Sequence, residues 1–121
     1  MVMVGIVLLG SCSHRAEHEA LMRRIESRVK LPAGALPLDK YARYYGSDGD
    51  VVVAEYLELP GFPAKPPSPG QRVWVHVPVG QRRWVGNPQA FPLIFDGGCS
   101  VIYVSYYPQT RRLTVKCGGD A

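Results

Sequence analysis

The sequence predicts an α+β fold in which one N-terminal amphipathic helix packs on a five- or six-stranded antiparallel sheet. Three observations support this prediction. Apolar residues recur every four positions over residues 13–30, as on one face of a helix. Most of the chain after residue 40 alternates between β-patterned runs and turn signals. Two cysteines flank a hairpin pattern near the C-terminus, so a disulfide is expected to clamp the last two strands.

The helix is predicted over residues 13–30. Leu21 and Ile25 belong to its apolar stripe, and Ser13 stands where it could cap the first turn. The segment also contains pairs in which a basic residue follows a glutamate by four positions. This order is the favourable one for an ion pair on a helix. Pro32 then ends the helical pattern. The helix is expected to cover one face of the sheet.

The first predicted hairpin joins residues 41–45 to residues 51–59. Its turn is expected around Asp48 and Gly49, a pair that favours tight hairpin turns. A Pro-rich loop at residues 60–72 follows, and it cannot join a sheet because proline lacks the N–H that a ladder needs.

Shorter β-patterned runs occupy the middle of the chain. Residues 73–77 and 83–85 read as strands with a turn at Gly80 between them. Residues 91–95 are apolar but contain proline, which suits an edge strand or a loop packed on the core. Residues 51–59 and 100–107 are apolar on both faces, so these two strands are expected to be central.

The last hairpin is predicted to place Cys99 directly opposite Cys117. A three-residue loop between Tyr106 and Thr110 gives this register and gathers the apolar side chains on one face. Directly opposed cysteines approach disulfide geometry, and such a loop stabilises the fold by about 3 kcal/mol. The alternative is a pair of buried free thiols in a reducing compartment.

The N-terminal segment carries a second signal. Leu9-Gly10-Ser11-Cys12 follows an apolar run that is shorter than the roughly 20 residues a membrane-spanning helix needs. The four residues resemble the lipobox of bacterial lipoproteins. The resemblance implies that residues 1–11 are a signal segment removed on export, that Cys12 is lipidated, and that residues 12–121 form a single small domain.

The resemblance is limited to the signal and lipobox, and no Lys or Arg precedes the apolar run as the pattern would require. Two alternatives stay open: secretion after ordinary cleavage, and a buried strand at the start of a cytosolic protein. The chain has three cysteines, and lipidation of Cys12 removes the odd one from the pairing. By the same resemblance, Ser13 favours the outer membrane, with the domain facing the periplasm.

Charge and motifs predict no cofactor, no metal site and no nucleic-acid partner. The net charge of +4 is a modest surplus that allows attraction to anionic lipid or envelope polysaccharide. Residues 14–18 match the H-x-x-E-H pattern of inverzincin metalloproteases, but a third ligand and a supporting scaffold are missing. A solvated helix start is the simpler interpretation. The acid and base candidates His76, Glu55, Asp96 and Asp50 are scattered, so no catalytic residue is predicted.

The candidate binding surface is aromatic and basic. An exposed face that stacks on sugar rings or on a partner protein would be lined by Tyr44, Tyr106, Tyr107, Arg43 and Arg112. The alternative is that these aromatics are half-buried cross-strand pairs.

The sequence thus predicts a small envelope lipoprotein, attached to the membrane through Cys12, that acts as a non-enzymatic binding or structural module for an envelope protein or polysaccharide. The other hypothesis is a periplasmic enzyme or an enzyme inhibitor that presents the stiff Pro-rich loop.

Overall fold

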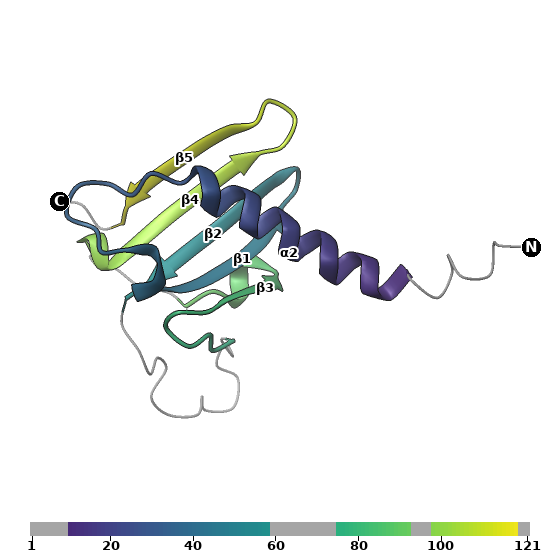
Figure 1. Cartoon of the computed structure of the whole chain (residues 1–121), viewed down its shortest axis with the longest axis horizontal. Coiled ribbons are helices and arrows are strands. Elements are labelled where there is room, and N and C mark those ends of the chain that lie inside the picture. Colours follow the sequence, from purple (N-terminus) through teal and green to yellow (C-terminus); the bar gives the residue numbers. More distant parts are fainter. Residues whose placement is uncertain (1–9, 59–74, 93–97, 119–121) are drawn as a thin grey trace, which may run out of the picture.

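The structure is a computed structural model that describes residues 10–58, 75–92 and 98–118, with side chains from residue 14 onward. Within these residues, five strands form one sheet in the order β3-β1-β2-β4-β5. A single long helix lies across one face of this sheet (Figure 1). The predicted α+β class, with a helix on a sheet, is confirmed.

Helix α2 (Gly10–Arg28) meets the sheet through the predicted apolar stripe. Met22 and Ile25 are buried in the core that lies between helix and sheet. The helix begins three residues before Ser13, so Ser13 lies inside it and the predicted cap is wrong. It ends at Arg28, and its first turns extend beyond the sheet (Figure 1).

The first hairpin is confirmed. A helical turn, η1 (Leu38–Lys40), leads into β1 (Ala42–Asp48), which pairs antiparallel with β2 (Val51–Leu57). The pairing of Asp48 with Val51 leaves a tight turn, in which Gly49 adopts φ 63°. Glycine suits this left-handed conformation because it has no Cβ to clash with the backbone.

The expectation of a wholly antiparallel sheet is wrong for one strand pair. Strand β3 (Arg82–Gly86) runs parallel to β1. Strand β2 ends beside the start of β1, and the chain re-enters the sheet at that same end, so β3 has to run along β1. Local sequence patterns do not reveal this pairing. At its far end Gly46 faces Gly86 so closely that a Cβ on Gly46 would lie 2.8 Å from the carbonyl oxygen of Gly86.

Strand β4 (Val101–Tyr107) pairs with β2 on one side and with β5 (Arg112–Cys117) on the other. Strands β2 and β4 are therefore internal, as predicted. The predicted register of the last hairpin is wrong, because Tyr107 pairs with Arg112 and Ile102 pairs with Cys117. The turn between the strands holds residues 108–111, one more than expected.

The disulfide between Cys99 and Cys117 is present, although the reasoning that placed the two cysteines opposite each other is not confirmed. Cys99 lies outside the ladder, in the short helical turn η3 (Gly98–Ser100). This turn brings its Cα within 4.6 Å of the Cα of Cys117. The hydroxyl of Tyr41 donates to the carbonyl of Cys99 and so ties the turn to the start of β1.

Apolar side chains cover both faces of the sheet. On the helix face, Tyr41, Tyr45, Tyr56 and Ile102 are fully buried. The second core lies on the opposite face and contains Ala42, Tyr44, Leu57, Val77, Phe91 and Val101.

The segments of the second core only partly follow the predictions. The described residues 75–77 are not a strand, but Val77 is buried and its N–H donates to the hydroxyl of Tyr44. Phe91 and Pro92 are buried after η2 (Pro88–Ala90), as the loop alternative proposed. The Pro-rich loop at 60–72, residues 93–97 and most of the predicted signal segment lie outside the described residues.

Candidate functional site

One flank of α2 faces β3, and its charges are neutralised by ion pairs. The Glu26 side chain is only 8 % exposed. One of its carboxylate oxygens accepts from Arg43 Nε at 2.8 Å and from the Tyr45 hydroxyl at 2.8 Å. The other oxygen accepts from Arg82 Nη1 at 2.8 Å, and Arg82 also donates to Glu19. This network binds the helix to the sheet, and its groups are occupied by one another.

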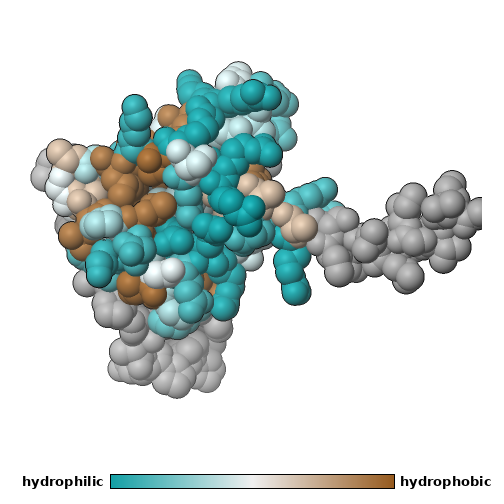
Figure 2. All heavy atoms as spheres, in the orientation of Figure 1, coloured by the Kyte–Doolittle hydropathy of each residue, from teal (hydrophilic) through white to brown (hydrophobic). Residues whose placement is uncertain are grey.

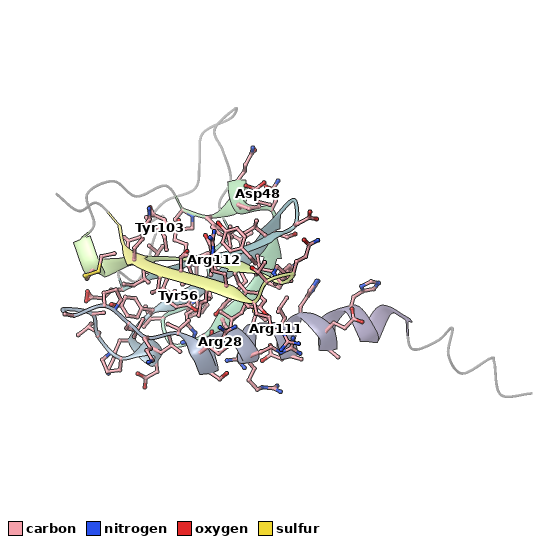
Figure 3. All side chains as sticks on the ribbon, turned by 90° about the horizontal axis from the view of Figure 1, so that it is seen from above. Arg28, Asp48, Tyr56, Tyr103, Arg111 and Arg112 are labelled. Atoms are coloured by element: carbon pink, nitrogen blue, oxygen red, sulfur yellow. A yellow bond between two sulfur atoms is a disulfide. The ribbon has the colours of Figure 1, made fainter. Side chains whose placement is uncertain are left out.

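The other flank of α2 faces the β4–β5 turn, and the charged residues that line the pocket there are all basic. Arg24 and Arg28 lie one helical turn apart and share an open pocket of about 400 Å³ with Arg111 and Tyr106. Figure 3 shows Arg28 of the helix beside Arg111 of the turn. We call this site the arginine pocket. None of its three arginines forms an ion pair with a described residue.

Tyr106 forms the floor of the arginine pocket. It is 3 % exposed, and the guanidinium carbon of Arg28 lies 5.9 Å from the centre of its ring, within the range of a cation–π contact. Its hydroxyl makes no hydrogen bond to any residue in the described part of the chain. The pocket therefore combines three cationic forks with one aromatic ring. Figure 2 shows that hydrophilic side chains cover much of this helix side of the molecule.

A smaller aromatic and basic contact lies on the opposite face of the same hairpin. The guanidinium of Arg112 lies 4.4 Å from the ring centre of Tyr107. Both residues line a shallow pocket of about 240 Å³ beside Asp50. Because neighbouring residues in a strand point to opposite faces, Tyr106 and Tyr107 serve two separate surfaces.

The structure does not bring the five residues of the predicted binding surface onto one exposed face. Tyr44 and Arg43 are 1 % and 7 % exposed, and they lie on opposite faces of β1. Tyr106 belongs to the arginine pocket, whereas Tyr107 and Arg112 lie on the opposite face.

Sequence reasoning missed Arg24, Arg28 and Arg111 as site residues. Two of them stand in basic pairs, Arg23-Arg24 and Arg111-Arg112, and such pairs are typical of solvated surface. Only the docking of the helix against the hairpin turn places them together.

A polar row crosses the far face of the sheet. It runs through facing positions of all five strands, namely Arg83, Tyr44, Glu55, Tyr103 and Lys116. Glu55, at its centre, is 6 % exposed, and its Oε2 has no hydrogen-bond partner in the described part of the chain. Burial raises the pKa of this carboxyl to about 7 and also raises the pKa of Tyr44. Glu55 can therefore exchange a proton near neutral pH.

The other acid and base candidates that the structure describes do not gather around Glu55. Asp50 is exposed in the β1–β2 turn, and His76 is exposed next to the buried Val77. Asp96 lies outside the described residues. The structure thus gives the enzyme hypothesis one perturbed carboxyl and no assembled set of catalytic groups within the described residues.

The H-x-x-E-H residues form an exposed start of α2. His14 and Glu17 are 79 % and 73 % exposed and contact each other at 4.0 Å. The ring of His18 stacks on Trp84 with centroids 4.1 Å apart. In the part of the chain that is described, no group of three or more His, Cys, Asp or Glu residues is placed to hold a metal ion.

Cys12, the predicted lipidation site, belongs to the first turn of α2. Among the helices that the structure describes, none has the length and apolar character needed to cross a bilayer. Comparison with protein-family models, with curated proteins and with solved structures finds no match to this chain. The site is therefore interpreted from its own geometry.

Proposed function

We propose that the chain is a lipid-anchored protein of the bacterial envelope, and that it works as a non-enzymatic binding module whose contact site is the arginine pocket. The observation that carries the binding role is the meeting of Arg24, Arg28 and Arg111 without an acidic partner among the described residues. The resemblance of residues 9–12 to a lipobox supports the location. The Cys99–Cys117 disulfide supports it too, since such bonds persist in oxidising compartments.

The charge arrangement favours binding over a purely structural role. Cations placed together repel one another, and these three exposed arginines keep N–H donors that a ligand can take over from water. On the opposite flank of the same helix, Arg43 and Arg82 are matched by Glu26 and Glu19. The pocket thus has the electrostatic character of a site that an anionic partner completes.

The anchor and the pocket lie on the same helix. Arg24 follows Cys12 by twelve residues, which is about 18 Å along an α-helix. A lipid at Cys12 would hold the pocket within one helix length of the membrane. We therefore expect the partner to be an envelope protein or polysaccharide that is held at, or reaches, the membrane surface.

Two experiments test the proposal. Incorporation of radiolabelled palmitate in cells tests the anchor, with Cys12→Ser as the control that should remain unlabelled. A photoreactive residue in place of the exposed Thr110 tests the site by in vivo crosslinking, with the same residue at the exposed Leu36 as the control.

We expect palmitate on the wild-type chain and an envelope component crosslinked from Thr110 but not from Leu36. An unlabelled wild-type chain would contradict the anchor. Absence of a specific adduct at Thr110 would contradict the binding role of the pocket.

A further inference from the structure

We propose that the arginine pocket binds a phosphate group, and that Arg111 occupies its place in the β4–β5 turn for this purpose. The inference rests on the proposed binding function and names the chemical class of its ligand. It is carried by the number and type of cations in the pocket, by a hydroxyl on its floor that has no partner among the described residues, and by the backbone of Arg111.

The donor set fits a phosphate better than a carboxylate. A guanidinium offers paired N–H groups that match two oxygens of one anion, so one arginine is enough to engage a carboxylate. A phosphate monoester has three free oxygens and nearly two negative charges at neutral pH. Arg24 and Arg28 approach from the helix and Arg111 from the turn, and these donors from two elements suit a tetrahedral dianion with three free oxygens.

Tyr106 contributes to the pocket through its hydroxyl and through its ring. Its hydroxyl lacks a partner among the described residues, and its ring contacts Arg28. A hydroxyl beside arginine forks supplies one more donor to a phosphate oxygen. The ring itself is 3 % exposed, and its cation–π contact helps to position Arg28 at the pocket.

The backbone conformation of Arg111 is one that glycine adopts at lower energetic cost than arginine. Its φ is 61°, and it is the only non-glycine residue with positive φ within the described segments. In the other hairpin of the sheet, the turn residue Gly49 has nearly the same φ, 63°. Glycine adopts this conformation without strain, whereas arginine does not. Arg111 is strained and its charged side chain lines the shared pocket. We take this combination as a sign that the side chain has a function there.

Two sources could supply the same phosphate chemistry: a lipid headgroup in the membrane, or a soluble phosphorylated saccharide. The test uses the full chain carrying Cys12→Ser, so that acylation cannot itself cause membrane binding. Inorganic pyrophosphate is titrated by calorimetry as the soluble probe, with malonate as the carboxylate control. Flotation with phosphatidylcholine vesicles, with and without phosphatidic acid, is the membrane probe.

The decisive variant is Arg111→Gly, and its matched control is Arg112→Gln. Both remove one positive charge at neighbouring positions, but only Arg111 lines the pocket. We expect Arg111→Gly to weaken phosphate binding about tenfold or more, as expected for a lost charge-assisted hydrogen bond. We expect Arg112→Gln to change it by less than about twofold. Because glycine suits the turn, Arg111→Gly should fold as well as the wild type, and circular dichroism confirms that binding was not lost through unfolding.

Binding to phosphatidic acid vesicles alone would assign the phosphate to a lipid, and binding to pyrophosphate alone would assign it to a soluble ligand. Binding to both would establish phosphate as the common determinant. The inference is overturned if neither probe binds, if malonate binds as tightly as pyrophosphate, or if Arg112→Gln weakens binding as much as Arg111→Gly. A specific crosslink from Thr110 together with any of these outcomes would leave the binding function standing and remove only the phosphate.

Discussion

The two flanks of α2 differ in whether their charged side chains have partners of opposite charge. Towards β3, Glu26 is enclosed by Arg43, Arg82 and the Tyr45 hydroxyl, so that a buried anion meets cations and a donor within hydrogen-bond distance. Towards the β4–β5 turn, the helix presents Arg24 and Arg28 to another arginine. On the first flank each buried charge has an opposite charge as its partner, whereas on the second the three arginines have no acidic partner among the described residues.

The difference teaches how to separate structural charges from functional ones in this molecule. A buried charge whose partners are all present helps to hold the helix in place. Removing one residue of such a network leaves the remaining buried charges without a partner. A cluster of like charges at the surface weakens the fold slightly and gains its value from a ligand. The predictions below test this distinction, beginning with the change of largest expected effect.

Breaking the paired flank should be costly. Glu26→Gln removes the anion that neutralises Arg43, whose side chain is 9 % exposed, so we expect the free energy of unfolding to fall by about 3–5 kcal/mol. Urea unfolding measures this loss. Glu17→Gln, on the same helix but 73 % exposed, should change stability by less than about 0.5 kcal/mol. Similar losses in the two variants would show that the network does not hold the helix.

Glu55 extends the comparison to a buried carboxyl that has no ion-pair partner among the described residues. Its folded pKa of about 7 lies above the ordinary value of 4.5, so the folded state keeps its proton to higher pH than the unfolded state. This contribution to stability is complete below about pH 4.5 and is lost as the pH rises through about 7, with a total near 3 kcal/mol.

Glu55→Gln mimics the protonated carboxyl at every pH. We expect the variant and the wild type to be equally stable near pH 4, and the variant to be more stable by about 3 kcal/mol near pH 8. Urea unfolding across this range measures the difference. A difference that does not vary with pH would contradict the assignment of the proton to Glu55.

Inserting an acid into the arginine pocket should convert the unpaired flank into a paired one. Arg24→Glu places a carboxylate four residues before Arg28, in the favourable order, and should raise the free energy of unfolding by about 0.5 kcal/mol at low salt. Added salt should stabilise the wild type by screening repulsion and should weaken this gain in the variant. If salt affects both proteins in the same way, the pocket arginines do not repel one another.

The smallest expected effect is at the turn. Arg111→Gly relieves the positive φ and removes one like charge, while glycine adds freedom to the unfolded chain. We expect the free energy of unfolding to stay equal or rise by up to about 0.5 kcal/mol. Arg112→Gly, in the extended strand β5, should instead lower it, because glycine weakens strands. Thermal unfolding of both variants checks the contrast, and a clear loss in Arg111→Gly would refute the strain argument.

The fold class and the first hairpin could be predicted because their causes are local. A four-residue apolar period marks the helix, and Asp48 with Gly49 marks a tight turn between two apolar runs. The cysteine pair was predictable as well, since one odd cysteine stood in a lipobox-like motif. The geometry of the disulfide was not predictable, because Cys99 lies in a helical turn outside the ladder and reaches Cys117 from there.

The register of the last hairpin and the direction of β3 could not be predicted for physical reasons. A positive φ at arginine has no signature in the sequence, yet it adds a residue to the turn and changes the pairing of β4 with β5. The pairing of β3 depends on where a long connection re-enters the sheet. The arginine pocket could not be predicted either, because Arg24 and Arg111 are distant in sequence and come together only when the helix packs on the sheet.

The matching backbone of Gly49 and Arg111 has an evolutionary consequence. Where a hairpin needs only to turn, selection is free to settle on the residue with the least strain, as it has at position 49. If Arg111 serves the proposed phosphate site, selection for that site retains an arginine where glycine would be less strained. Relatives that lack the proposed ligand are then expected to carry glycine or asparagine more often at this position, so the residue found there would track the trait.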